Sequence, residues 1–280
     1  MLNRREFIRN SLVASLALPG LSLDLSPPAG PQIGIILNTV QQEMEADWKA
    51  TASRLADLGY TFLEGKVHRG GNRAYRKYVK NLGLHIMGSG IRLDDRPQKM
   101  AQQLRQAEKR GQEFVCCYWP WRSSAKDLSR EECLATAERL NRFGRLIKQA
   151  GFQLTWHNHD KEFVTIEGQT ALDWLMEQTD PAYVNLQLDT YWAVKGGGNP
   201  LDILARYPGR VPLTHLKDMA AGPDQAMCCV GDGLLDWQAL WSAQQQAGVR
   251  YASLELDRAE DGLGCAQSAM QSLISAQGKD

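Results

Sequence analysis

Short segments typical of buried β-strands alternate eight times with segments of helical periodicity between residues 31 and 280. This pattern predicts an α/β protein folded as a single (β/α)8 TIM barrel. Strict alternation favours a parallel sheet covered on both faces, and about 250 residues is the usual size for eight βα units. An open, doubly wound sheet is the alternative, but it should carry a glycine-rich phosphate turn after its first strand, where this chain has Asn38-Thr39-Val40.

The first half of the barrel is predicted between residues 32 and 150. The opening run QIGIIL is short and β-branched, as expected of a buried strand, and apolar residues with helical spacing follow it. The next helical segments are basic, then polar, then long and amphipathic. The predicted strands are 32–37, 60–63, 84–87 and 113–118, and the predicted helices are 42–58, 74–82, 97–110 and 129–150.

The second half repeats this organisation as far as the C-terminus. Each strand is again a run of four or five mostly apolar residues, and a polar or charged residue follows it. No repeat array, low-complexity segment or second domain interrupts the pattern. The predicted strands are 152–156, 184–188, 211–214 and 251–254, and the predicted helices are 170–178, 200–207, 237–247 and 266–276.

Residues 1–30 have a different character and predict a targeting segment. The paired Arg4-Arg5, followed by Glu6, Phe7, Ile8 and Arg9, resembles a twin-arginine export signal, and a moderately apolar stretch and a Pro/Gly break come next. An ordinary N-terminal helix with a linker is the alternative. The expected organisation is therefore a signal and linker over 1–30 and a barrel over 31–280. The protein is expected to be recognised by the twin-arginine machinery, to reach the periplasm and to have no membrane attachment after export.

Composition narrows the possible functions. Lysine plus arginine number 32 and aspartate plus glutamate number 32, so the formal net charge is zero, which argues against a nucleic-acid partner. The six cysteines contain no C-x-x-C spacing of a zinc or redox site. Cys116 and Cys117 are expected to pack as small apolar residues, and Cys228-Cys229 could oxidise in the periplasm. No disulfide framework is expected.

Chemically versatile residues follow the predicted strands. In a barrel of this kind the site lies at the carboxyl ends of the strands. Glu64 ends the second strand, and His157, Asp189, His215 and Glu255 end the fifth to the eighth. The last four are spaced by about one βα unit each, so they should face one mouth. Two imidazoles and two carboxylates suit a divalent ion such as Mn²⁺, Zn²⁺, Co²⁺ or Fe²⁺.

Five stretches around these strand ends carry a family resemblance. With them, residues 31–280 resemble the xylose isomerase-like TIM barrels of the sugar phosphate isomerase/epimerase superfamily. The stretches are WHNHDKEF (156–163), LDTYWAVKGGGNP (188–200), VPLTHLKD (211–218), VGDGLLDW (230–237) and LELD (254–257).

The resemblance implies one divalent metal ion, with Mg²⁺ added to the candidates above, and a Glu255 that is both ligand and proton-transferring base. His157 stands where many members carry a glutamate. His159 shares its strand face and is therefore the alternative fourth ligand. At the third strand, Gly88-Ser89-Gly90 stands where members often have a histidine.

Further residues gain expected roles from their positions. Lys217 lies two residues after His215 and should face the same mouth, where it can hold a substrate oxygen or stabilise an enolate. Glu64 is expected to reach a sugar hydroxyl or to act as a base. The residues expected to contact the sugar are His159, Asn158, Trp192 and Trp119.

The function that this resemblance implies is a metal-dependent isomerase or epimerase that acts through an enediolate on a sugar or keto-sugar. A lyase or dehydratase of a keto-sugar or inosose on the same site is the first alternative, and a non-catalytic periplasmic sugar-binding protein is the second. An endonuclease-IV-like phosphodiesterase is disfavoured, because the chain has five histidines in all and no basic excess. The expected partner is a small sugar, and the sequence predicts no particular oligomeric state.

Overall fold

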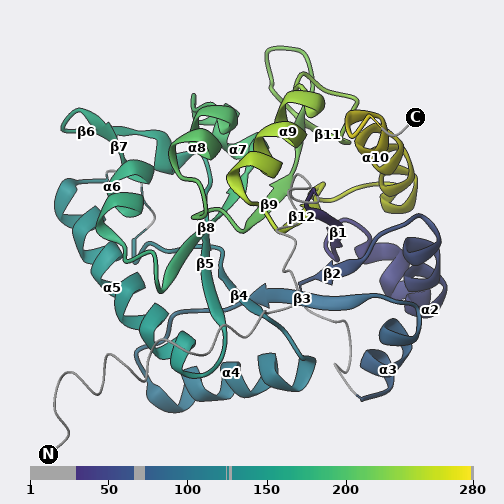
Figure 1. Cartoon of the computed structure of the whole chain (residues 1–280), viewed down its shortest axis with the longest axis horizontal. Coiled ribbons are helices and arrows are strands. Elements are labelled where there is room, and N and C mark those ends of the chain that lie inside the picture. The colour runs from purple at the N-terminus through teal and green to yellow at the C-terminus, as the bar shows by residue number, and fades with distance from the viewer. Residues whose placement is uncertain (1–29, 66–72, 124, 126–127, 279–280) are drawn as a thin grey trace, which may run out of the picture.

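A computed structural model describes residues 30–65, 73–123, 125 and 128–278, in which eight parallel strands close into a barrel (Figure 1). The last strand pairs with the first, which confirms the predicted (β/α)8 TIM barrel. Apart from Gly30, the predicted signal segment lies outside the described residues. In their order around the barrel the strands are β1 (Gln32–Ile36), β12 (Tyr251–Leu254), β9 (Leu213–Leu216), β8 (Val184–Asp189), β5 (Gln153–His157), β4 (Phe114–Cys117), β3 (His85–Gly90) and β2 (Phe62–Glu64).

The helices surround the barrel on its outside (Figure 1). Polar caps set several of their starts: the Ser129 side chain accepts a hydrogen bond from the Glu132 N–H at the start of α5, and Asp261 caps α10, which therefore begins earlier than predicted. Within the described residues, no helix is long and apolar enough to cross a membrane. The helices are α2 (Gln41–Asp57), α3 (Arg73–Asn81), α4 (Pro97–Arg110), α5 (Arg130–Gln149), α6 (Ala171–Gln178), α7 (Thr190–Lys195), α8 (Pro200–Arg206), α9 (Trp237–Ala247) and α10 (Gly262–Ala276).

Several short elements that were not predicted from the sequence lie in the loops that follow the strands. Helix α7 follows β8 directly, because Asp189 at the strand end also caps the helix by accepting a hydrogen bond from the Trp192 N–H at 2.8 Å. A 3-10 turn, η1, follows β5, and two small hairpins complete the loops. These elements are η1 (Lys161–Phe163), β6 (Thr165–Ile166), β7 (Gln169–Thr170), β10 (Asp218–Met219) and β11 (Met227–Cys228).

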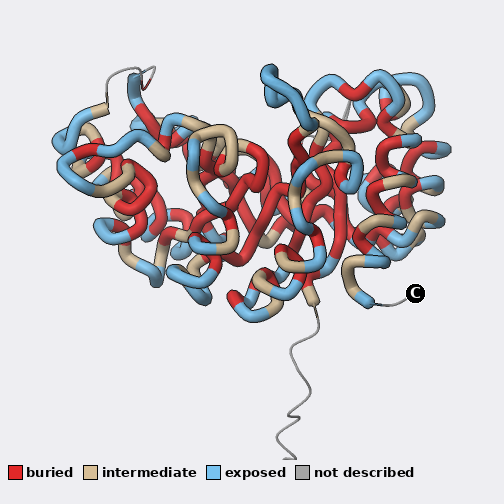
Figure 2. Tube along the Cα trace, turned by 90° about the horizontal axis from the view of Figure 1, so that it is seen from above, coloured by how far each residue is buried: buried red, intermediate tan, exposed pale blue. Residues whose placement is uncertain are grey.

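Buried residues line the central strands, whereas the outer turns of the helices are exposed (Figure 2). Side chains alternate between the two faces of each strand, so every second residue points into the barrel. An apolar cluster that includes Phe62, Phe114, Leu213 and Tyr251 packs together, with the Phe62 and Tyr251 rings 5.2 Å apart. Two residues further along three of these strands, the inward positions are polar: Glu64, His215 and Ser253. The candidate site therefore has an apolar layer beneath it.

One disulfide corrects the expectation for the cysteines. Cys229, just after β11, is bonded to Cys265 on α10, and their Cα atoms lie 5.6 Å apart, which suits a disulfide. Cys228 is free, so the neighbouring pair 228–229 does not oxidise together. Cys116 and Cys117 are buried and unpaired, as expected of small apolar residues.

Candidate active site

A fully buried glutamate lies at the centre of the polar layer. Glu64, the last residue of β2, accepts hydrogen bonds at Oε1 from the Tyr118 hydroxyl (2.9 Å) and the Gln187 amide (2.8 Å). Its Oε2 accepts one from Ser253 Oγ (2.5 Å) and lies 3.1 Å from His215 Nε2. Burial alone would raise the pKa of Glu64, but attraction to His215 and these hydrogen bonds hold that pKa below its usual range. Glu64 is therefore an ionised anchor beneath the mouth.

The imidazole of His215 lies between two carboxylates. Its Nε2 faces Glu64, and its Nδ1 lies 2.6 Å from Glu255 Oε2. Burial lowers the pKa of His215, but the two glutamates outweigh burial and raise the pKa to about 10. On its own, this imidazole therefore carries a proton on each nitrogen at pH 7. A metal ion at Nδ1 would replace that proton, while the contact of Nε2 with Glu64 keeps the orientation of the ring fixed. Glu64 thus orients the Nδ1 of His215 toward the mouth.

The predicted metal ligands converge at the same place. Ligand atoms of His157, Asp189 and His215 all lie within 4.8 Å of one another, and all three residues are buried. His157 Nε2 is 3.6 Å from Asp189 Oδ2, and Glu255 is joined to the group through its contact with His215 Nδ1. Register explains this convergence, because Asp189 pairs with His215 and His157 pairs with Gln187 in the neighbouring strand. Bonds of about 2.0–2.3 Å to one ion fit donors at such separations.

The hydrogen bonding of these donors also fits a cation. Four buried atoms in the group make no well-aligned hydrogen bond within the described residues: His157 Nδ1, Asp189 Oδ2, His215 Nδ1 and Glu255 Oε2. The last three are held by charge, because His215 Nδ1 lies close to Glu255 Oε2 and Lys217 Nζ lies close to both carboxylates. Buried polar atoms are normally hydrogen-bonded, so a cluster held by charge alone is consistent with a cation as a further partner. Two imidazoles and two carboxylates are the donor types that a divalent transition ion prefers. His157, rather than His159, is the histidine that belongs to this group.

Lys217 provides a fixed positive charge within the site. Its Nζ lies 3.3 Å from Asp189 Oδ2, 3.0 Å from Glu255 Oε2 and 3.2 Å from Asp257 Oδ2, and the residue is 2 % exposed. Burial would lower the pKa of Lys217, but the three carboxylates raise it above its ordinary value. The side chain is therefore an ammonium ion that can donate hydrogen bonds to an anionic oxygen in the mouth.

Aromatic rings form one wall of the mouth. The His159 ring lies 5.4 Å from the Trp119 ring and 5.5 Å from the Trp192 ring, measured between centroids, and 5.0 Å from the His157 ring. Burial lowers the pKa of His159 to about 4, so its imidazole is neutral at pH 7. Apolar and aromatic faces of this kind suit the C–H face of a sugar. The structure thus brings three of the four predicted sugar contacts together.

Two predicted site residues, Asn158 and Glu64, do not line the small cavity above the ligands. The amide of Asn158 is fully buried and holds the backbone of Asp189, accepting a hydrogen bond from its N–H (2.9 Å) and donating one to its carbonyl (3.3 Å). Glu64 has no exposed surface and both of its oxygens are already bonded, so it does not reach a sugar hydroxyl in this structure. Both side chains support the ligands instead of contacting the mouth.

Three residues that sequence reasoning missed also shape the site. Tyr118 follows β4 and bonds Glu64, and Asp257 follows Glu255 by two residues, so the strand-end rule could have indicated both. Glu162 is fully buried in η1, where it accepts hydrogen bonds from the Trp121 indole and from the N–H of His159 (2.6 Å). Glu162 belongs to the stretch WHNHDKEF that carries the family resemblance, but its burial could not be predicted, because it depends on how the loop after β5 folds back.

A small cavity of about 210 Å³ opens above the ligands. It gives a substrate access to the ligand group, to Lys217 and to the aromatic wall. Its lining comprises Ile36, Asn38, Tyr118, His157, His159, Trp192, His215, Lys217, Glu255 and Asp257.

Comparison with known proteins places the chain in a family. Residues 52–275 match the model of the xylose isomerase-like TIM barrel family, and the chain belongs to that family. It is 34% identical over 133 residues to the inosose dehydratase of Lacticaseibacillus casei, covering 42% of this chain and 43% of the relative. It is 26% identical over 189 residues to that of Geobacillus kaustophilus, covering 60% of each. The chain thus matches about half the length of these curated relatives.

Solved structures show the same fold at low identity. A sugar phosphate isomerase/epimerase from Parabacteroides distasonis superposes with a TM-score of 0.73 at 20% identity, covering 88% of this chain and 98% of that one. The IolI protein with a bound zinc atom superposes with a TM-score of 0.65 at 14% identity, covering 88% and 96%. These likenesses concern the barrel itself.

Proposed function

We propose that this protein is a metal-dependent dehydratase, a lyase that removes water from a keto-sugar or an inosose-type ketone. One observation carries the choice: among the ligand-group residues that line the small cavity, Glu255 is the one carboxylate, and His157 stands where a second could have been. The other carboxylate of the cavity, Asp257, accepts a hydrogen bond from Lys217 Nζ at 3.2 Å. Burial and the neighbouring charge of His215 hold the pKa of His157 well below its ordinary value, so this imidazole is a weak base. Epimerisation through two bases needs a proton acceptor on each face of the substrate, whereas dehydration needs one. Similarity to inosose dehydratases supports the same choice.

His157, Asp189, His215 and Glu255 would together hold one ion of Mn²⁺, Zn²⁺, Co²⁺, Fe²⁺ or Mg²⁺. When bound, such an ion would polarise the substrate carbonyl and make the neighbouring C–H bond more acidic. Burial raises the pKa of Glu255, but attraction to His215 and Lys217 holds it well below its usual range, so the carboxylate is ionised and can accept that proton. The Lys217 ammonium donates hydrogen bonds where negative charge develops on oxygen. The proton taken up by Glu255 then passes to the departing β-hydroxyl, so that the C–O bond breaks, water leaves and a C=C bond forms. Trp119, His159 and Trp192 hold the face of the ring.

The deciding experiment is a substrate screen in deuterated water. Purified protein is loaded with each candidate metal and incubated with inososes and 3-keto-sugars. We expect loss of water that depends on the metal, with a new unsaturated ketone seen by NMR and absorbance. Deuterium in an epimer or isomer without loss of water would favour the isomerase alternative. If the protein binds sugars, retains no stoichiometric metal ion and turns over no sugar, the alternative of a non-catalytic sugar-binding protein is supported.

The support that Glu64 gives to His215 leads to a prediction for metal affinity. Glu64→Gln keeps the shape of the side chain but removes the anionic acceptor at His215 Nε2. Loss of such a partner typically weakens metal binding by about 10–100-fold. The measurement is a competition titration with a metal chelator, accompanied by thermal unfolding to verify the fold. Ser253→Ala removes only one hydroxyl donor to the same carboxylate and should change the affinity less. Wild-type affinity in a folded Glu64→Gln variant would contradict the role given to Glu64.

We further propose that residues 1–30 direct the barrel domain, residues 31–280, to the periplasm. The disulfide between Cys229 and Cys265 supports this proposal, because such bonds persist in oxidising compartments. Replacing Arg4 and Arg5 together by lysine should retain the protein in the cytoplasm with both of those thiols reduced. Cell fractionation and thiol alkylation with mass spectrometry measure the two effects, and Arg9→Lys is the matched control that should be exported. An undiminished periplasmic yield of the double variant would refute the twin-arginine route.

A further inference from the structure

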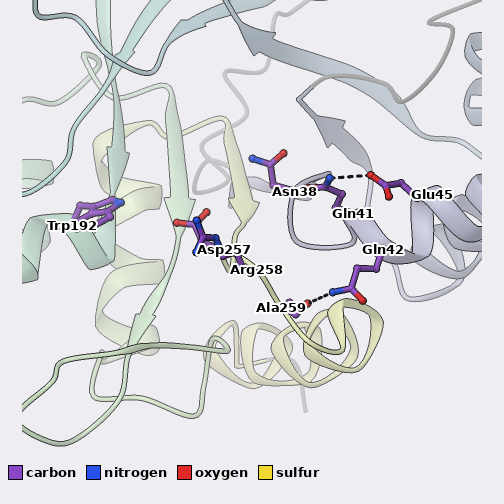
Figure 3. A pocket seen from close by; sticks show the side chains of 8 residues that line it. All are labelled: Asn38, Gln41, Gln42, Glu45, Trp192, Asp257, Arg258 and Ala259. Carbon is purple, nitrogen blue, oxygen red and sulfur yellow. Dashed lines mark hydrogen bonds between the residues drawn. The ribbon is translucent and has the colours of Figure 1, made fainter.

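A large cleft adjoins the small cavity at the barrel mouth. It has a volume of about 880 Å³, roughly four times the 210 Å³ of the cavity above the metal ligands. The two spaces share Asn38, Trp192 and Asp257, so they adjoin at the mouth. Figure 3 shows the side chains that line the larger one. The cleft is lined by Asn38, Gln41, Gln42, Glu45, Trp192, Asp257, Arg258 and Ala259.

The two volumes correspond to ligands of different size. At roughly 30 Å³ of liquid volume per water, the small cavity holds about seven waters, which suits a single sugar ring. The adjoining cleft is in the range of about 300–1,000 Å³ that is typical of pockets for larger ligands. A substrate of one ring would therefore leave most of the mouth unfilled.

The chemistry of the cleft matches neutral hydroxyl groups. Three amides, from Asn38, Gln41 and Gln42, offer both donors and acceptors. Two carboxylates, from Glu45 and Asp257, line the cleft together with the single guanidinium of Arg258. This balance of charge does not favour a phosphate or another anion.

Several of these side chains are available for a ligand. Within the described part of the chain, the side chains of Asn38 and Arg258 have no hydrogen-bond partner, and both line the cleft. Gln42 donates only a long hydrogen bond, 3.5 Å, to the carbonyl of Ala259 (Figure 3). An amide and a guanidinium without partners can bond to hydroxyl groups without first breaking an internal contact.

The backbone at Arg258 provides an independent observation. Arg258 has a φ of +56°, in the left-handed region that an arginine rarely adopts. Such strained positions concentrate at ligand sites. Arg258 follows Asp257, whose carboxylate is bonded to Lys217 in the small cavity. The strained turn therefore connects the reacting end of the mouth with the cleft.

Trp192 stands at the junction of the two spaces. It lines both of them, its ring lies 5.5 Å from that of His159, and Lys217 Nζ lies 5.8 Å from its centroid. An indole in this position can pack against two linked rings.

We infer that the substrate is a neutral glycoside, with the reacting sugar in the small cavity and a second sugar unit in the cleft lined by Asn38, Gln42, Trp192 and Arg258. This inference rests on the proposed function, because the small cavity is taken to hold the unit that reacts. It assigns the cleft to recognition of the second unit through its hydroxyl groups.

The test compares single rings with their disaccharides on the metal-loaded, full-length protein. Calorimetry measures binding of glucose and galactose against cellobiose, maltose, lactose and trehalose, and saturation-transfer NMR shows which rings touch the protein. At least one disaccharide should bind about tenfold or more tightly than its single ring, with transfer to both rings. Arg258→Asn removes the guanidinium but suits the left-handed backbone, and it should weaken the disaccharide by about 10-fold or more while sparing the single ring.

Arg105→Asn is the matched control, because Arg105 is exposed on α4 and lines neither space, so both affinities should stay unchanged. The inference is overturned if no disaccharide binds more tightly than its single ring, or if Arg258→Asn affects both ligands equally or neither. The keto-sugar screen tests the proposed function independently. If glycosides bind in a way that depends on Arg258 but no substrate is turned over, the assignment of the cleft stands and the dehydratase proposal is rejected. If single rings are turned over but glycosides bind no more tightly, the dehydratase proposal stands and the assignment of the cleft is rejected.

Discussion

A Glu255→Gln variant is expected to lose turnover almost completely and to bind its metal ion more weakly. The change removes the carboxylate proposed to take the proton, a contribution typically of about 10²–10⁴-fold. It also removes the negative charge 2.6 Å from His215 Nδ1 and 3.0 Å from Lys217 Nζ. Initial rates on the best substrate of the screen measure the first effect, and a chelator competition measures the second.

The matched control is Glu260→Gln, which makes the same chemical change at an exposed position on the loop after β12. It should leave rate and metal affinity unchanged. A Glu255→Gln protein that kept both full activity and full metal content would show that neither the base nor the ligand has been assigned correctly. Full metal content with no activity would restrict Glu255 to proton transfer.

A Lys217→Ala variant is expected to keep its metal and to turn over about 10²–10³-fold more slowly, as is typical when one stabilising donor is lost. The ammonium competes with a bound cation for the Oδ2 of Asp189 and the Oε2 of Glu255. Its removal should therefore leave metal affinity unchanged or increase it. Steady-state kinetics and metal analysis of the same sample separate the two effects.

Lys148→Ala, on the exposed face of α5, is the corresponding control and should behave as the wild type. Loss of the metal in the Lys217 variant would show that the ammonium holds the carboxylates in place instead of acting on the substrate. Unchanged turnover would remove Lys217 from the mechanism. In either case, the contrast with Glu255→Gln distinguishes a ligand from a hydrogen-bond donor.

The barrel could be predicted from the sequence because each of its strands is a short apolar run and each helix that follows has a clear period. Helix α7 could not be predicted in the same way. Its six residues begin directly at the end of β8, without a connecting loop, and Asp189 serves both elements. The expected pattern is a strand, a loop and then one helix, so a short helix that directly follows the strand is taken for part of the loop.

The strand-end rule predicted which residues meet at the mouth, but it could not predict their depth. Depth depends on the stagger between neighbouring strands, and β2 shows a shift of register against β3 between Leu63 and Glu64. Glu64 contacts His215 and Ser253 from the barrel interior and is not among the residues that line the small cavity. Asn158 differs for another reason: it alternates with His157, so its side chain turns away from the barrel interior and bonds the backbone of Asp189. The partner of Cys229 likewise depends on tertiary contact alone.

The two oxygens of Asp189 have separate tasks, since Oδ1 caps α7 while Oδ2 faces the proposed ion. A single carboxylate therefore sets both the start of a helix and the position of a ligand. The beginning of α7 cannot be shifted without also displacing that ligand. The insertion of even one residue here would therefore disturb both the helix start and the proposed metal site. The spacing between β8 and Trp192 is therefore fixed by two requirements at once, the start of a helix and the position of a ligand.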